Sequence, residues 1–155
     1  MHLPRPFPIT AEAAVRRVRA AEDAWNACTP EQISLGYSLD TAWRTRADFL
    51  RGRAAVARFL TRRRVRQQDC LTLAEPWAFD RDRIAVRFAS EWHDDSGNWF
   101  RTFGNANWKL DAAGLIIQCH TSANDLPIAA MDKRLHWELG SVRPAAHPGL
   151  AELGF

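Results

Sequence analysis

The sequence predicts a single α+β domain in which helices come first along the chain and a meander of antiparallel strands follows. Apolar residues recur at helical spacing in the first third of the chain, whereas alternating apolar and polar residues dominate residues 71–124. Only short turns separate those alternating segments, so neighbouring strands should pair antiparallel. The length of 155 residues suits one domain, 1–155, with a sizeable core.

An arm and two helices are expected at the N-terminus. Residues 1–9 carry three prolines and should form an extended arm. Thr10 is the expected cap of a helix that ends near residue 27 or 28, because apolar residues recur at helical spacing after it. The sequence Thr29-Pro30-Glu31-Gln32 combines a cap, a proline at the first helical position and a glutamine at the capping-box position. It predicts a short second helix that stops near Gly36.

A strand, a third helix and a series of strands are expected next. Residues 41–46 alternate as a strand does, and Gly52 to about Arg66 has the spacing of a helix. The later strands are expected at residues 71–79, 83–91 with an extension, 99–110 and 115–124. Glycines and prolines break up residues 127–155, yet this segment is too apolar to remain exposed. We therefore expect a C-terminal extension that packs back on the domain or on a partner subunit.

The composition favours a globular protein of a reducing compartment. A net charge of +3 is too small to indicate nucleic acid, and the arginine run at residues 58–66 has no interleaved aromatic apart from Phe59. The three cysteines are widely spaced and form no CxxC pair. Neither a signal-peptide pattern nor an apolar run of membrane length occurs. We expect a cytoplasmic protein with no nucleic-acid partner and no membrane partner.

The segment from Arg83 to Leu110 predicts a small-molecule pocket. It reads as two long strands joined by a DDSGN turn, and it contains three of the seven tryptophans. Polar side chains are unusually dense between those tryptophans. Aromatic walls with a few convergent polar groups are typical of ligand sites.

Glu91 and His93 are the candidate catalytic residues. They are two positions apart, so they share a face of a regular strand. A carboxylate can hold a histidine in one tautomer and raise its basicity, which suits a general base. The alternative is a solvated strand end beside a hairpin, where charged residues are common.

Arg101, Asn105 and Asn107 share one face of the next strand. Buried amides need every hydrogen bond met, so this face either lies outside, at a dimer interface for example, or lines a polar cavity. In the cavity these side chains would orient a ligand or stabilise a developing oxyanion. Gly104 indicates a bulge or a close backbone approach, and a bulge would reverse the assignment of the faces.

Trp43 and Arg46 belong to the first strand and are candidate ligand-binding residues. Trp43 falls where that strand would enter the pocket, although a plain core role is equally compatible with its position. An arginine that entered the cavity would suit a carboxylate or a phosphate, because a guanidinium binds both through two hydrogen bonds. Surface charge is the alternative for Arg46.

A metal site and an organic cofactor are not expected. His93, Asp94 and Asp95 together with a distant His120 have the arrangement of a facial triad. The two aspartates, however, open a turn in which aspartate is expected for turn reasons. His120 is retained as a candidate ligand-binding residue.

Several long stretches of the chain match a known family. They are VRAAEDAWN (Val18–Asn26), AWRTRADFLRGR (Ala42–Arg53), WAFDRDRIAVRFASEWHDDSGNWFRTFGNANW (Trp77–Trp108), SANDLPIA (Ser122–Ala129) and HPGLAELGF (His147–Phe155). In these stretches the chain resembles an uncharacterised, mostly bacterial family of SnoaL-like proteins within the nuclear-transport-factor-2-like superfamily.

The resemblance implies a cone, in which a strongly curved antiparallel sheet wraps around the helices and encloses a pocket. It also implies a homodimer formed through the outer sheet face. It makes Asn124 and Asp125, at the end of the last strand, candidates for the pocket floor, with a strand-ending cap as the alternative. Steroid-isomerase-like members carry a catalytic acid on the first strand, but here that strand reads Trp43-Arg44-Thr45-Arg46, so that assignment does not transfer.

The function expected from the sequence is the binding of a small molecule in a tryptophan-lined pocket. Members of the superfamily include isomerases, dehydratases, cyclases and epoxide hydrolases, so cofactor-free lyase, isomerase or hydrolase chemistry is compatible with the resemblance. The alternative is a non-catalytic binding or assembly module that acts as a homodimer. The substrate and the reaction are left open.

Overall fold

The three predicted helices are confirmed by the computed structural model, which describes residues 7–155; most of the predicted N-terminal arm lies outside this range. α1 (Ala11–Ala27) begins after Thr10, whose side chain accepts a hydrogen bond from the Ala13 amide at 3.1 Å. α2 (Pro30–Ser34) has the predicted capping box: the Thr29 hydroxyl accepts from the Gln32 amide at 3.2 Å, and the Gln32 side chain accepts from the Thr29 amide at 2.9 Å. α3 (Arg53–Arg66) starts directly after Gly52.

One six-stranded sheet follows the order β2-β1-β6-β5-β4-β3. Its strands are β1 (Tyr37–Thr45), β2 (Asp48–Arg51), β3 (Gln68–Asp80), β4 (Arg83–His93), β5 (Trp99–Leu110) and β6 (Ile116–Ile128). The predicted antiparallel meander from β3 to β6 is confirmed. β1 pairs in parallel with β6 and antiparallel with β2, a short strand that the sequence did not predict.

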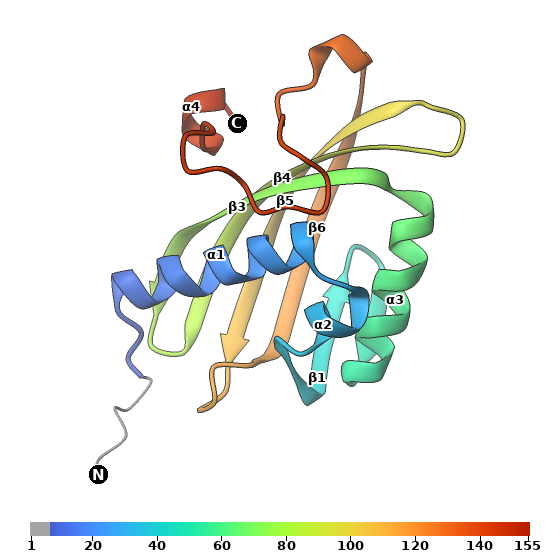
Figure 1. Ribbon diagram of the computed structural model, residues 1–155. Helices are drawn as coiled ribbons and strands as arrows, with labels where there is room; N and C mark the ends of the chain where they lie inside the picture. Colours follow the sequence, from blue (N-terminus) through green and yellow to red (C-terminus); the bar gives the residue numbers. More distant parts are fainter. Residues whose placement is uncertain (1–6) are drawn as a thin grey trace.

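The helices lie on the inner, concave face of this sheet, and Figure 1 shows α1 crossing it with α2 and α3 to one side. Side chains of α1, α3 and the inner face form the main core, which includes Val18, Val56, Trp43, Ile84 and Trp108. The register through β4, β5 and β6 is continuous around Gly104, so the bulge considered there is absent. Gly104 instead permits a close approach, because a Cβ atom at this position would overlap the Phe88 ring.

Two polar side chains of α1 bind the free edge of β3. Asn26 donates to the Thr72 carbonyl and accepts from the Thr72 amide, both at 2.9 Å. Glu22 accepts from the Ala74 amide at 2.9 Å. The helix thereby satisfies the backbone groups of an edge strand, which would otherwise be open to pairing with another chain.

The C-terminal extension, residues 127–155, returns to the domain. It contains the 3₁₀ turn η1 (Ala130–Asp132) and the short α4 (Leu150–Leu153). Leu135 and Leu150 pack with Leu71, Leu73 and Ala89 in a second apolar cluster on the outer face of the sheet. None of the helices in residues 7–155 has the length and apolar character needed to span a membrane.

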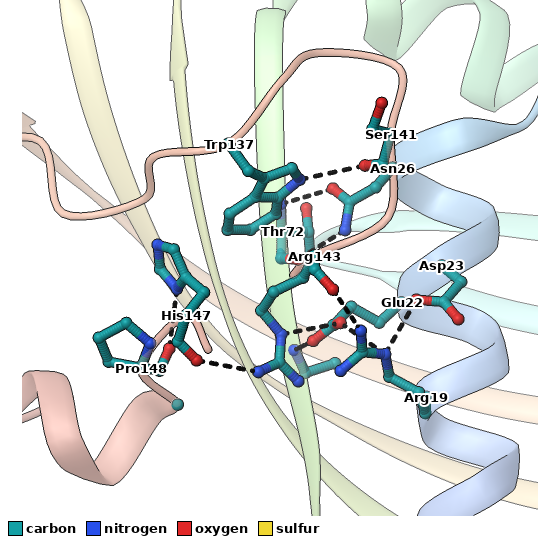
Figure 2. A network of polar contacts seen from close by, with 12 residues as sticks. Arg19, Glu22, Asp23, Asn26, Thr72, Trp137, Ser141, Arg143, His147 and Pro148 are labelled. Carbon is teal, nitrogen blue, oxygen red and sulfur yellow. Dashed lines mark hydrogen bonds and ion pairs between the residues drawn. The ribbon is translucent and has the colours of Figure 1, made fainter. Parts of the chain in front are cut away.

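Figure 2 shows how the extension also reaches α1. Arg143 donates from Nε to the Glu22 carboxylate at 3.1 Å, and Arg19 donates to the Arg143 carbonyl at 2.6 Å. Glu22 is buried, so the Arg143 contact compensates a charge that water does not reach. The extension is therefore fixed to both the outer face and the helix layer.

Candidate ligand-binding cavity

A cavity of about 490 Å³ lies between α1, α3 and the inner face of the sheet. Seven aromatic side chains contribute to its wall: Trp25, Tyr37, Trp43, Phe49, Phe59, Phe88 and Trp108. The ring centroid of Trp43 lies 5.5 Å from that of Tyr37 and 5.3 Å from that of Phe59. Trp43 therefore holds the position expected from the sequence, on the cavity wall.

Small inward-facing residues leave the space for this cavity. They alternate with larger outward-facing residues along three central strands, and they are Ser90, Thr102, Ala106, Thr121 and Ala123. A packed interior normally contains few voids larger than a water molecule, so a cavity of this size makes the inner face the candidate ligand site.

Most polar groups on the wall already have a protein partner. The Thr72 and Ser90 hydroxyls are 2.8 Å apart, and the Trp43 indole donates to the Thr121 hydroxyl at 2.9 Å. Among residues 7–155 the Tyr37 hydroxyl has no hydrogen-bond partner, so it is available to a ligand. Burial raises the pKa of this phenol and raises the pKa of the Cys119 thiol to about 12, so both groups stay protonated at neutral pH.

Arg46 and Asp125 form an ion pair beside the cavity, where a neighbouring hollow of about 400 Å³ adjoins it. The Arg46 guanidinium donates to Asp125 Oδ1 at 2.6 Å and to the Ala123 carbonyl at 3.0 Å. The Thr102 hydroxyl donates to the same Oδ1 atom at 2.7 Å and accepts from the Trp92 indole at 2.8 Å. Of the sequence candidates, Trp43 and Arg46 line the cavity, and Asp125 lines the neighbouring hollow.

Glu91 and Arg101 lie on the outer face of the sheet, away from the cavity, contrary to the expectation from the sequence. The Glu91 side chain is 1% exposed and contacts Arg101 at 2.8 Å. The amides of Arg134 and Leu135 donate to the same carboxylate at 2.9 Å and 2.7 Å. The C-terminal extension thus covers Glu91, and every hydrogen bond that the carboxylate accepts comes from the protein.

His93 also lies on the outer face, at the end of β4. Its Nε2 atom is 2.8 Å from Asp69 Oδ2, and its Nδ1 atom is 2.7 Å from the Asp94 carbonyl. The hydrogen bond with Asp69 is the largest cause that raises the pKa of His93, followed by the bond with Asp94. His93 therefore has its carboxylate partner in Asp69 rather than in Glu91.

The remaining candidates do not converge on the cavity either. Asn105 and Asn107 on β5, and His120 and Asn124 on β6, are exposed on the outer face. In the register of the sheet, the positions of His93 and His120 are eight residues of β5 apart, or roughly 26 Å. That separation precludes a shared metal ion, and residues 7–155 contain no group of three side chains placed to hold one.

Arg63 is a cavity residue that the sequence analysis did not single out. It lies on α3 with its guanidinium 4.5 Å from the centroid of the Trp25 ring. Its spacing from Val56, Phe59 and Leu60 places it on the apolar side of the helix, which is the signal that distinguishes it within the arginine run. Trp25 and Phe59, which also line the cavity, could be recognised in the same way, because each occupies an apolar position of its helix.

Comparisons with known proteins agree with this architecture. An NTF2-like protein of unknown function from Exiguobacterium sp. 255-15 superposes with a TM-score of 0.59 at 18% identity, over 70% of this chain and 96% of that chain. A hypothetical protein with a ketosteroid isomerase-like fold from Catenulispora acidiphila, in complex with trimethylamine, gives 0.59 at 13% identity, over 87% and 89%. An LEH-like epoxide hydrolase of M. tuberculosis gives 0.53 at 14% identity, over 70% and 82%. These likenesses establish an NTF2-like fold.

The sequence itself also matches a family. No curated protein matches the chain. The model of a family described as protein of unknown function, DUF1348, matches residues 6–136, which include α1 to α3 and the entire sheet. The stretch His147–Phe155, which carried part of the resemblance, lies beyond the matched residues. With most of its length matched, and with the NTF2-like fold around a tryptophan-walled cavity, the chain belongs to the DUF1348 family.

Proposed function

We propose that the protein binds a small, mainly apolar organic molecule in the cavity between the helices and the inner face of the sheet. The observation that carries this proposal is the volume of about 490 Å³ enclosed by aromatic side chains. Ligand pockets in proteins commonly have volumes of about 300–1,000 Å³ and are lined mostly by apolar groups. Because Trp43 and the hydroxyls of Thr72, Ser90 and Thr121 already bond to the protein, the wall offers a ligand aromatic faces more than hydrogen bonds.

A thermal-shift screen against a broad set of metabolites tests this proposal. A ligand that binds only the folded state raises the melting temperature by mass action. An Ala123→Phe variant provides the control, since Ala123 is half-buried on the wall and a phenyl group there would fill part of the cavity. We expect a cluster of related compounds to stabilise the wild type and not the variant. Stabilisation that persists in the variant would contradict the proposed site.

A second candidate function is cofactor-free acid–base chemistry in the hollow that adjoins the cavity at Arg46. Asp125 supports it, because its Oδ1 atom accepts from both Arg46 and Thr102 while its Oδ2 atom has no partner among residues 7–155. A carboxylate held by one oxygen in this way keeps the other free to receive a proton from a bound ligand. The fold is shared with an LEH-like epoxide hydrolase, which makes hydrolase or isomerase chemistry a reasonable assay to begin with.

An Asp125→Asn substitution separates catalysis from binding. The amide retains an oxygen that accepts from Thr102 and Arg46, so folding and ligand binding should be preserved. Turnover of a ligand identified in the screen should fall by about 100-fold or more if the carboxylate is the base. Full turnover in this variant would leave binding as the sole function of the cavity.

The non-catalytic alternative assigns the exposed outer face to a homodimer. Asn105, Asn107, His120 and Asn124 form a polar surface on β5 and β6 that would be available for such an interface. Light scattering of the purified protein tests this assembly. A dimer mass that becomes a monomer mass when these side chains are replaced by lysine would support it, and a monomeric wild type would rule it out.

A further inference from the structure

Arg63 has an unusual environment for an arginine on this helix. It is half-buried, and its guanidinium lies against the face of Trp25, with 4.5 Å between the guanidinium carbon and the ring centroid. Its Nε atom donates to the Gln67 side chain at 2.7 Å. Its Nη1 and Nη2 atoms form no hydrogen bond, and no carboxylate within residues 7–155 forms an ion pair with it. Two of its three nitrogen atoms therefore remain available.

The environment of Arg63 favours the binding of an anion. A charge removed from water is costly unless an opposite charge or several hydrogen bonds compensate it. Burial is also the largest cause that lowers the pKa of Arg63, although an arginine remains protonated at neutral pH. Arg19 and Arg143 contrast with it, because both use their side chains on the Glu22 carboxylate.

The other charges around the cavity reinforce this preference. Arg62 and Arg66, one turn apart on the same helix, also border the cavity and form no ion pair within the described residues. The lining contains two acids, of which Glu22 is already bound to arginines, and only Asp48 stands against the free cations. The open end of the cavity is thus electropositive where α3 borders it.

We infer that the ligand of this cavity is a carboxylate, whose two oxygens accept from Nη1 and Nη2 of Arg63 while its apolar part lies in the cavity, against the aromatic wall that Trp25 and Trp43 form together. This inference rests on the proposed binding function and specifies its ligand class. Trp25 holds the guanidinium plane from one side, and Gln67 holds Nε, so the fork is oriented before the ligand arrives. One buried guanidinium matches one carboxylate in charge and geometry, whereas a phosphate dianion would retain uncompensated charge among the apolar walls.

A matched pair of probes tests the ligand class by calorimetric titration. 2-Naphthoate and 2-naphthamide have the same planar ring system and nearly the same shape, and they differ in charge. We expect the wild type to bind 2-naphthoate at least about tenfold more tightly than 2-naphthamide, as a charge-assisted pair of hydrogen bonds requires. An Arg63→Gln variant should bind both probes equally, and Arg63→Lys, which keeps the charge without the fork, should give an intermediate preference.

Arg58→Gln is the matched control, because Arg58 is exposed on the same helix and outside the cavity lining. It removes the same charge and should keep the full preference. Arg63 also borders a smaller neighbouring cavity of about 340 Å³, so the titration includes Ala123→Phe, which fills only the central cavity. Loss of 2-naphthoate binding in that variant supports the inference, and an unchanged preference would overturn it.

The outcomes distinguish this inference from the proposed function. Equal binding of both probes to the wild type, or a preference that survives in Arg63→Gln, would overturn the carboxylate assignment and leave the binding function standing. Binding of neither probe would count against the cavity as a ligand site, and so against both. If Arg58→Gln also loses the preference for 2-naphthoate, the preference comes from the overall positive charge of α3, and the specific role of Arg63 is overturned.

Discussion

Glu91 accepts a hydrogen bond from Nε of Arg101 on the neighbouring strand at 2.9 Å, and Nη2 of the same guanidinium lies 2.8 Å from the carboxylate in an ion pair. Arg101 also donates to the Asp132 carbonyl at 2.7 Å, and its guanidinium lies 4.6 Å from the centroid of the Phe155 ring. The pair therefore connects two central strands to both ends of the C-terminal extension. Residues that the sequence suggested as parts of an active site hold the outer layer of the protein together.

Replacement of Glu91 by glutamine should destabilise the fold. It leaves the Arg101 charge buried without a partner, which typically costs about 3–5 kcal/mol. We expect the free energy of unfolding in urea to fall by about 3 kcal/mol. Glu75→Gln is the control, because Glu75 on β3 pairs with Arg87 on β4 at 3.1 Å across adjacent strands but is 35% exposed, and such pairs contribute about 0–1 kcal/mol. Equal effects of the two substitutions would contradict the structural role of Glu91.

Deletion of residues 140–155 should lower the melting temperature. It removes Leu150 from the outer apolar cluster and takes Arg143 away from the buried Glu22 carboxylate. Loss of that burial and of that ion pair should lower the midpoint by about 10 °C or more. Calorimetry of the truncated chain measures the change. An unaltered melting temperature would show that the extension contributes nothing to stability.

The His93–Asp69 pair predicts a pH-dependent contribution to stability. Its hydrogen bonds raise the pKa of His93 above the ordinary value near 6.5. Because this pKa is raised in the folded state, the contribution of the pair to the free energy of unfolding is fully present below about pH 6.5. It is lost as the pH rises through the folded-state pKa of His93. We expect Asp69→Asn to remove this part of the profile, measured as melting temperature against pH. Asparagine suits the site because Asp69 has a φ of 50°. A profile that is the same in both proteins would contradict the prediction.

Gly104→Ala should strain the inner face at the cavity wall. A Cβ atom there would overlap the Phe88 ring, so the ring must move into the cavity. Overpacking of this kind costs about 1–3 kcal/mol, measured by urea unfolding. A Phe88→Leu substitution provides the space that the methyl group needs, and the double variant should lose less stability than the two single losses together. Additive losses would show that the two residues do not compete for space.

The elements of the fold were predictable because local signals specify them. The Thr29–Gln32 capping box and the aspartates and glycines in the turns between strands act within a few residues, so the three helices and four later strands were located correctly. β2 was missed because Asp48–Arg51 is too short for an alternating pattern. β6 extends to Ile128, beyond the predicted end, because it pairs with the full length of β5.

The site was only partly predictable for a physical reason. Alternation along a strand shows which residues share a face, but it does not show which face is enclosed. The polar residues Asn105 and Asn107 suggested the cavity, whereas the small residues Ala106 and Ser90 create it. Trp43 lies at the cavity because the first strand has its tryptophan on the inner face, whereas Arg46 reaches the cavity from the turn after that strand, where its φ is 55°. Small residues that alternate with polar residues along a strand were therefore the pattern that indicates the enclosed face.

The most direct test of the central claim, that the inner-face cavity is the ligand site, is the affinity of 2-naphthamide for three proteins, measured by calorimetry. They are the wild type, the cavity-filled Ala123→Phe variant, and the outer-face double variant Asn105→Ala, Asn107→Ala. We predict equal affinity for the wild type and the outer-face variant, and an affinity at least about tenfold weaker for the cavity-filled variant. Weakened binding in the outer-face variant, with unchanged binding in the cavity-filled one, would contradict the account.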